Sequence, residues 1–112
     1  MYRASKFNSA DLVAFYGAVN GELRHLIEYE DDWLAILANA AAILRHQLDE
    51  INWVGFYLLK NEVLVLGPFQ GLPACSTITL GSGVCGAAVA TMKTMVVDDV
   101  HEFPGHIACD EA

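Results

Sequence analysis

The spacing of hydrophobic residues changes along the chain, and the first half has the period of helices. Hydrophobic residues recur every three or four positions over residues 9–28, with breaks near Gly17 and Gly21, so one or two helical segments are expected there. The same period returns over residues 32–48 and predicts an amphipathic helix. Asp31 is expected to cap the N-terminus of this second helix.

The second half of the chain has mainly the pattern of β-strands. Residues 52–60 and 62–69 are rich in aromatic and β-branched side chains and predict a β-hairpin. Residues 75–80 alternate in polarity and predict a third strand, and residues 94–100 predict a fourth strand, followed by a long loop. Glycines and small helix formers over about residues 83–92 predict a short helix. The order indicates one α+β domain with a mostly antiparallel sheet flanked by helices.

Composition and charge narrow the classes of function. Hydrophobic residues make up 54% of the 112 residues and charged residues 18%, which excludes a disordered chain. The formal net charge of -8 argues against binding to nucleic acid or to an anionic membrane. No apolar run approaches the ~20 residues of a membrane span, and residues 1–12 lack the apolar stretch of a signal peptide. A cytoplasmic location is therefore expected.

Three cysteines are the main candidates for chemistry. Their odd number, without a Cys-x-x-Cys pair, makes a structural disulfide framework unexpected. Cys85 is placed in the first turn of the short helix, where the helix dipole favours a thiolate, although a buried apolar role is more common for such a cysteine. Cys75 lies at the start of the strand predicted over residues 75–80, where an inert role is the more common one. Cys109 lies in the final loop, and reactive residues are frequent in loops.

The neighbours of Cys109 leave its role open. His101 and His106 are near it in sequence and could assist a thiolate, whereas Asp110 would oppose one. A zinc site formed by the three cysteines and His106 is an alternative. However, the spacings of 10 and 24 residues between the cysteines lack the paired ligands that zinc sites usually have, so no metal is expected.

Two aromatic residues could belong to a binding site. Trp53 and Tyr57 are four residues apart on a predicted strand, so they are expected to face the same side. Most such pairs are part of a core. They could instead form the wall of a pocket for a small apolar or sulfur-containing group.

Four stretches of the chain together resemble one protein family. They are, in order, NWVGFYLL, GPFQGLPAC, GSGVCGAAVAT and VVDDVHEFPGHIACD. This series closely resembles the free methionine-(R)-sulfoxide reductases, a catalytic branch of the GAF-domain superfamily. The match extends from about Trp33 to Ala112 and is strongest over residues 52–110. Three blocks that contain cysteine match with their spacing, whereas a general GAF sensor domain need not contain any of them.

The resemblance implies a redox mechanism and a role for each candidate residue. Cys109 would be the nucleophile that attacks the sulfur of free methionine-(R)-sulfoxide, releases methionine and becomes a sulfenic acid. Cys75 would condense with it to a disulfide that thioredoxin reduces, and Cys85 would be an alternative or backup resolving cysteine. Trp53 and Tyr57 would line the substrate pocket. The resemblance implies no bound cofactor.

The resemblance also implies that part of the family's fold has no counterpart in these residues. The family continues after the GHIACD block with further strands and a final helix, and with acidic side chains that hold the substrate amine and help to protonate the leaving oxygen. Asp110 and Glu111 do not match those acids. Residues 1–112 are therefore expected to form an incomplete GAF-like domain with weak or absent reductase activity.

An incomplete sheet has a consequence for assembly. Strand 52–59 is expected to lack a neighbour on one side, and an uncovered apolar strand invites pairing with another chain. A homodimer, possibly strand-swapped, is therefore expected. Two alternatives to the reductase remain open: a non-catalytic GAF-type domain that binds a small molecule, and a self-associating fragment.

Overall fold

The computed structural model describes residues 6–7 and 10–105, and these belong to two compact units. The first unit contains the described residues up to Phe56 together with Pro68–Gly71, and the second contains Tyr57–Gly67 and the described residues from Leu72 onward. The division therefore passes through the β-hairpin, because each of its two strands contributes residues to both units.

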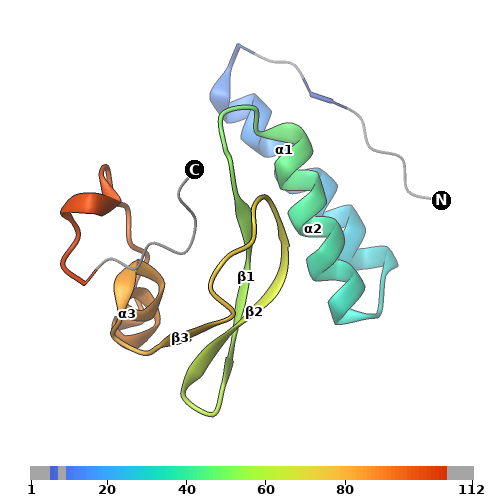
Figure 1. The fold of residues 1–112 in the computed structure, drawn as a ribbon. Coiled ribbons are helices and arrows are strands. Elements are labelled where there is room, and N and C mark those ends of the chain that lie inside the picture. The colour runs from blue at the N-terminus through green and yellow to red at the C-terminus, as the bar shows by residue number, and fades with distance from the viewer. Residues whose placement is uncertain (1–5, 8–9, 106–112) are drawn as a thin grey trace. The chain divides into compact units, whose positions relative to one another are not determined.

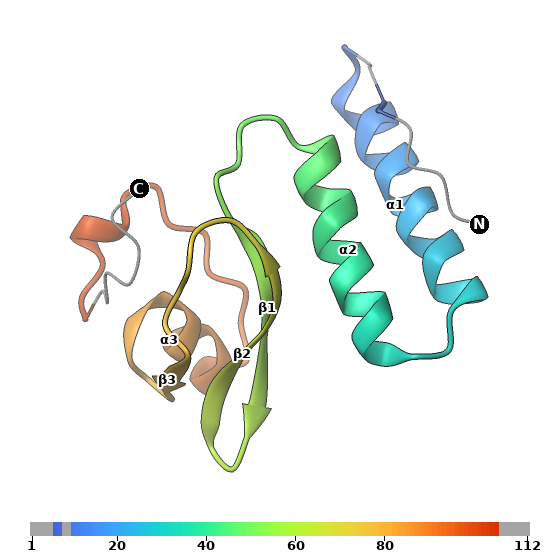
Figure 2. The same ribbon diagram turned by 45° about the vertical axis from the view of Figure 1, so that its right-hand side comes forward.

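The first unit contains two helices that pack side by side (Figures 1 and 2). Helix α1 (Leu12–Tyr29) begins after Asp11, whose carboxylate accepts hydrogen bonds from two backbone N–H groups of the first turn at 2.9 and 3.4 Å. The helix is continuous through Gly17 and Gly21. A glycine costs a helix only about 1 kcal/mol relative to alanine. Packing of the buried face of α1 compensates for this cost, so the breaks expected near Gly17 and Gly21 do not occur.

Helix α2 (Trp33–Gln47) confirms the helix predicted over residues 32–48, but its cap differs from the prediction. The capping residue is Asp32, whose carboxylate accepts a hydrogen bond from the backbone N–H of Ala35 at 3.0 Å. The prediction that Asp31 caps the helix was wrong by one residue. The backbone N–H of Asp31 instead donates to the carboxylate of Glu30 at 3.1 Å.

The hydrophobic core of the first unit lies between these helices. Leu26 of α1 is 5% exposed, and Ile43 of α2 is 2% exposed. They form a buried cluster with Ala40, and Leu23 and Phe56 pack against it. Because the buried residues of α2 include alanines, the helices can approach closely along this face.

The strands form a three-stranded sheet in the order β1-β2-β3, as expected for the mostly antiparallel α+β class. Strands β1 (Val54–Lys60) and β2 (Val63–Gln70) are joined by Asn61 and Glu62, which both have positive φ angles, 51° and 65°. Two residues of this conformation form the turn that best matches the twist of a hairpin. Strand β3 (Thr77–Thr79) pairs antiparallel with β2, with the register Val63↔Thr79, Leu64↔Ile78 and Val65↔Thr77.

The second unit contains helix α3 (Gly83–Thr91), which lies against β3, and a 3-10 helix, η1 (Val100–Glu102) (Figure 1). The strand predicted over residues 94–100 was wrong: these residues are irregular up to the start of η1. A strand needs a neighbour to satisfy its backbone groups, and the described sheet offers none here. Val96 is accordingly 90% exposed.

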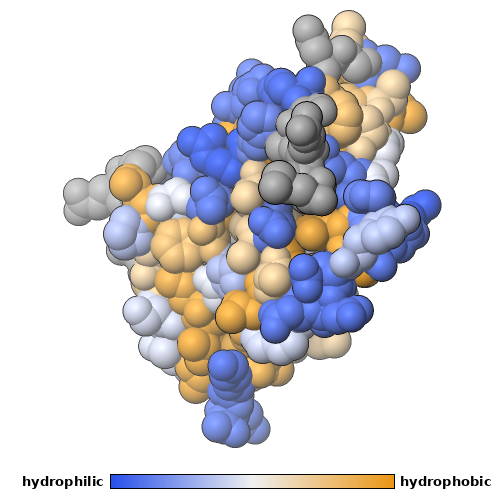
Figure 3. Space-filling view, turned by 90° about the vertical axis from the view of Figure 1, so that its right-hand side faces the viewer, coloured by the Kyte–Doolittle hydropathy of each residue, from blue (hydrophilic) through white to orange (hydrophobic). Residues whose placement is uncertain are grey.

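Part of the apolar composition lies on the surface rather than in the core. Val13 is 83% exposed, Tyr29 77% and Met92 87%, and Figure 3 shows hydrophobic residues beside hydrophilic ones on the face that it draws. Among the described helices, none combines the length and the hydropathy that crossing a membrane requires.

Candidate functional site

Three of the predicted site residues meet in the second unit: Tyr57, Cys75 and Cys85. Tyr57 lies in β1, Cys75 in the segment between β2 and β3, and Cys85 in α3. The phenol of Tyr57 donates a hydrogen bond to the backbone carbonyl of Cys75 at 2.8 Å. Tyr57 and Cys85 also interact electrostatically. Cys109, the predicted nucleophile, lies outside the described residues, as do His106, Asp110 and Glu111.

The backbone on both sides of Cys75 is held in place. The Tyr57 hydroxyl binds the carbonyl of Cys75, and the carbonyl of Ser76 accepts a hydrogen bond from the backbone N–H of Leu66 in β2 at 2.9 Å. The second bond extends the β2–β3 pairing by one step toward the cysteine. Cys75 itself is partly buried and disulfide-bonded.

Cys85 has a different chemical state. It is a free and exposed thiol. Its place in the first turn of α3 agrees with the helix predicted over about residues 83–92. The turn lies close to β3: a Cβ atom added at Gly86 would lie 2.6 Å from the carbonyl oxygen of Thr79. Only glycine allows this approach without a shift of the backbone.

Two interpretations of Cys85 were open, a thiolate favoured by the helix start and the more common buried thiol, and the pKa of the thiol supports the second. Although the residue is exposed overall, its sulfur is partly covered, and this burial raises the pKa of the thiol above its ordinary value. Loss of water around the sulfur disfavours the charged form of the thiol. Cys85 is therefore a less reactive thiol than its place in the helix indicated.

Tyr57 remains protonated over a wider pH range than a free tyrosine. Burial raises the pKa of its phenol, and the negative charge that Cys85 carries when deprotonated raises this pKa further. The hydroxyl can therefore donate its hydrogen bond to Cys75 throughout the neutral range.

Trp53 belongs to the first unit and lies just before β1, not inside the strand. Its indole stacks on the ring of Phe69 from β2, with ring centroids 5.5 Å apart. A Cβ atom on Gly55 would come within 2.8 Å of the Trp53 ring, so the absence of a side chain there makes room for the stack. Since Trp53 and Tyr57 belong to different units, their common face stays a prediction.

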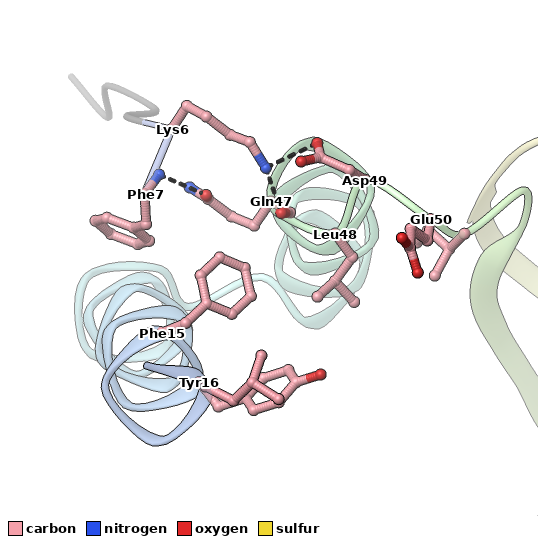
Figure 4. Close-up of a pocket in the computed structure, with 10 residues that line it drawn as sticks. Lys6, Phe7, Phe15, Tyr16, Gln47, Leu48, Asp49 and Glu50 are labelled. Atoms are coloured by element: carbon pink, nitrogen blue, oxygen red, sulfur yellow. Dashed lines mark hydrogen bonds and ion pairs between the residues drawn. The ribbon is translucent and has the colours of Figure 1, made fainter. Parts of the chain in front are cut away.

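A pocket of about 430 Å³ lies in the first unit, where sequence patterns gave no sign of one (Figure 4). Gln47, only 1% exposed, accepts a hydrogen bond from the backbone N–H of Phe7 at 2.9 Å through its side-chain oxygen. Lys6 donates to the backbone carbonyl of Gln47 and pairs with Asp49 at 3.0 Å. Phe15 and Tyr16 also line the pocket, and none of the described residues that line it is a cysteine. Cys75 and Cys85 are therefore not part of this pocket.

The zinc alternative loses support from the state of Cys75. A disulfide-bonded cysteine has no thiolate to offer a metal. Within residues 6–7 and 10–105, no three His, Cys, Asp or Glu side chains are grouped as metal ligands would be. His101 lies in η1, where its backbone N–H donates to the carboxylate of Asp99 at 3.0 Å.

Sequence reasoning missed two contacts that shape the site. The first is the hydrogen bond between Tyr57 and Cys75, which joins residues 18 positions apart. The second is the support of Trp53 by Phe69 and Gly55. The only sequence signal for the second contact is a pair of aromatic residues near glycines on two adjacent strands.

Two curated relatives are similar to most of the chain, although no protein-family model matches it. A free methionine-R-sulfoxide reductase of Escherichia coli (strain K12) is 52% identical over 98 residues, which cover 88% of this chain and 59% of the relative. A free methionine-R-sulfoxide reductase of Saccharomyces cerevisiae is 39% identical over 126 residues, which cover 98% of this chain and 70% of the relative. The chain thus spans between 59% and 70% of the length of these two proteins.

Solved structures agree with these relatives. The free methionine-R-sulfoxide reductase of Neisseria meningitidis, determined in complex with its substrate, matches with a TM-score of 0.90 and 44% identity over 96% of this chain and 65% of that one. A solved GAF domain matches with a TM-score of 0.85 and 37% identity over 91% of this chain and 62% of that one. The chain therefore has the GAF fold over the matched residues.

Proposed function

Because the chain belongs to the free methionine-R-sulfoxide reductase family and has a GAF fold, we propose that it reduces free methionine-R-sulfoxide to methionine. The recognition of this family from four sequence stretches and the GAF-like fold are confirmed. The observation that carries the proposal is the 39% identity to the yeast reductase across 70% of its length. The substrate is assigned by analogy with the Neisseria relative, whose structure contains its substrate.

In the proposed first step Cys109 is the nucleophile. Its thiolate attacks the sulfoxide sulfur and forms a sulfur–sulfur bond, and the sulfoxide oxygen takes up a proton from solvent. The oxygen then passes from the substrate sulfur to the Cys109 sulfur as a hydroxyl group while the sulfur–sulfur bond breaks, which leaves Cys109 as a sulfenic acid. Methionine leaves with the electron pair. Two electrons therefore pass from the cysteine sulfur to the substrate sulfur.

In the proposed second step Cys75 resolves the sulfenic acid. The Cys75 thiol attacks the sulfur of Cys109, a disulfide forms, and the hydroxyl leaves as water. The disulfide-bonded state of Cys75 supports this role, and we propose Cys109 as its partner. Cys85 is a free thiol whose pKa is raised by burial, so we assign it only the backup role.

We propose thioredoxin as the reductant that closes the cycle. Its dithiol exchanges with the Cys75–Cys109 disulfide, so that both cysteines return to thiols and thioredoxin becomes the disulfide. The electrons come from outside the chain, and the mechanism uses no bound cofactor.

Two aromatic residues complete the proposed binding site. We propose that Trp53 and Tyr57 line the pocket for the methionine side chain. The stack of Trp53 on Phe69 supports this role, because a rigid ring can hold a thioether or methyl group in one place.

For the 112 residues produced alone, we propose weak activity. The two reductases from E. coli and yeast are longer, and this chain spans 59% and 70% of them. Departure of the sulfoxide oxygen needs a proton, and a positioned acid accelerates such a step by typically ~10²–10⁴-fold. We propose that the part of the family without counterpart in these residues supplies those acids.

A coupled assay tests the proposed function. Thioredoxin, thioredoxin reductase and NADPH are mixed with the chain and with one resolved diastereomer of methionine sulfoxide, and NADPH oxidation is followed with free methionine as the product. We expect slow oxidation with the R form and the background rate with the S form. Equal rates with both forms, or oxidation without release of methionine, would contradict the proposal.

A further inference from the structure

We propose that Tyr57 is a positioning residue for Cys75, and that its hydrogen bond to the Cys75 carbonyl favours the disulfide form of this cysteine over the thiol form. This inference deepens the proposed function, on which the role of Cys75 as resolving cysteine rests. Its measurable consequence is a thiol–disulfide equilibrium, which exists whether or not the chain reduces a sulfoxide.

The argument begins with the geometry of the hydrogen bond. The bond is 2.8 Å long, is partly buried, and joins a strand to the segment between two other strands. Ser76, the next residue, is bound to β2 through Leu66 at 2.9 Å. Together these contacts fix the peptide groups around Cys75 without using its side chain. These contacts therefore restrict the backbone of the residue whose sulfur forms the disulfide.

The second step concerns the state in which the bond is observed. Cys75 is disulfide-bonded in the structure, and the Tyr57 hydroxyl donates to it in that state. A disulfide and this hydrogen bond both restrict the same residue. If one restriction is already present, the other costs less conformational entropy, so each favours the other. Removal of the hydroxyl should therefore shift Cys75 toward the thiol form.

The third step is that the donor is present at working pH. Burial raises the pKa of the Tyr57 phenol, and the nearby Cys85 raises this pKa further, so the hydroxyl keeps its proton. The hydrogen bond is therefore available throughout the range in which thiol exchange is fast.

The test compares two variants that each remove one tyrosine hydroxyl. Tyr57→Phe loses the bond to Cys75, whereas Tyr29→Phe loses the hydroxyl of a side chain that is 77% exposed. The oxidised 112-residue chain and both variants are equilibrated in a series of glutathione redox buffers, then alkylated, and the oxidised fraction at Cys75 is read by mass spectrometry.

We expect the equilibrium constant for reduction to rise about fivefold in Tyr57→Phe, the effect of one ordinary hydrogen bond. We expect less than a twofold change in Tyr29→Phe. An equilibrium in Tyr57→Phe within twofold of the parent chain, or displaced toward the disulfide, would overturn the inference.

If circular dichroism shows that Tyr57→Phe does not fold, an NMR measurement on the parent chain tests the inference instead. Linkage requires that the hydrogen bond weakens when the disulfide is reduced. The NMR signal of the hydroxyl-bearing ring carbon of Tyr57 should therefore shift on reduction, while that of Tyr29 stays in place. An unchanged Tyr57 signal would overturn the inference. Absence of sulfoxide reduction together with the expected redox shift would instead refute the proposed function alone.

Discussion

The indole ring of Trp53 stacks on the phenyl ring of Phe69, with ring centroids 5.5 Å apart and an angle of 16° between the ring planes. The stack joins Trp53, just before β1, to Phe69 near the end of β2. The start of β1 and the end of β2 therefore hold each other in place. Gly55 lies beside the Trp53 ring and the Cβ atom of Phe69. The proposed wall of the substrate pocket therefore depends on a residue without a side chain.

We predict that Gly55→Ala destabilises the chain by roughly 1–3 kcal/mol, the usual cost of an extra methyl group in a packed site. The added Cβ would lie 2.8 Å from the Trp53 ring. Gly17→Ala is the matched control, because nothing lies within 4 Å of the added Cβ. There alanine should stabilise α1 by about 0.5–1 kcal/mol. Urea unfolding followed by circular dichroism measures both changes, and the same sign for both variants would contradict the packing argument.

The cap of α2 provides a second matched pair. Asp32→Ala removes the carboxylate that accepts from the Ala35 N–H at 3.0 Å, and we predict a loss of about 1 kcal/mol in the free energy of unfolding. Asp31→Ala leaves this bond intact and should change that free energy by less than about 0.5 kcal/mol. Equal losses for the two variants in urea unfolding would show that the cap assignment is wrong.

The raised pKa of Cys85 predicts how fast its thiol reacts as the pH changes. Because burial raises this pKa, a smaller fraction is thiolate at any given pH than for an ordinary cysteine. In the Cys75→Ser/Cys109→Ser double variant, the midpoint of the alkylation rate against pH should lie above that of the same protein unfolded in concentrated urea. A midpoint at or below the unfolded value would contradict the role of burial.

The position of β1 predicts self-association. Among the described strands β1 has a neighbour on one side only, and Leu59 at its end is 56% exposed. We predict that size-exclusion chromatography with light scattering gives the mass of a homodimer, and that Leu59→Lys weakens it, since a charge on an edge strand opposes pairing. A monomer at every concentration would refute the dimer. A dimer of unchanged affinity in Leu59→Lys would refute pairing through β1.

The sequence predicted the helices and the hairpin well because their signals are local. The period of three to four residues is enough to locate α2, and the change to β-branched and aromatic residues locates β1 and β2. Asp31 and Asp32 are both good capping residues, and only the backbone conformation decides between them. Residues 94–100 have strand propensity, but a strand also requires a partner, which a local pattern does not show.

The candidate site was predictable only in part. The three cysteines and the two aromatic residues were found from residue type and spacing, and a family resemblance gave each of them a role. The contact between Tyr57 and Cys75 crosses 18 positions, so no periodicity indicates it. Likewise the pKa of Cys85 depends on the packing around α3, while the sequence shows only its place near a helix start.

The central claim is that Cys109 reduces the R form of free methionine sulfoxide, and single-turnover chemistry tests it most directly. The chain is fully reduced, freed of reductant, and incubated for a long period with the R or the S diastereomer before methionine is measured. We predict about one methionine per chain from the R form, none from the S form, and none from either form with Cys109→Ser. Cys75→Ser should still release the first methionine. Equal release by the parent chain and Cys109→Ser, or no release from the R form, would contradict the account.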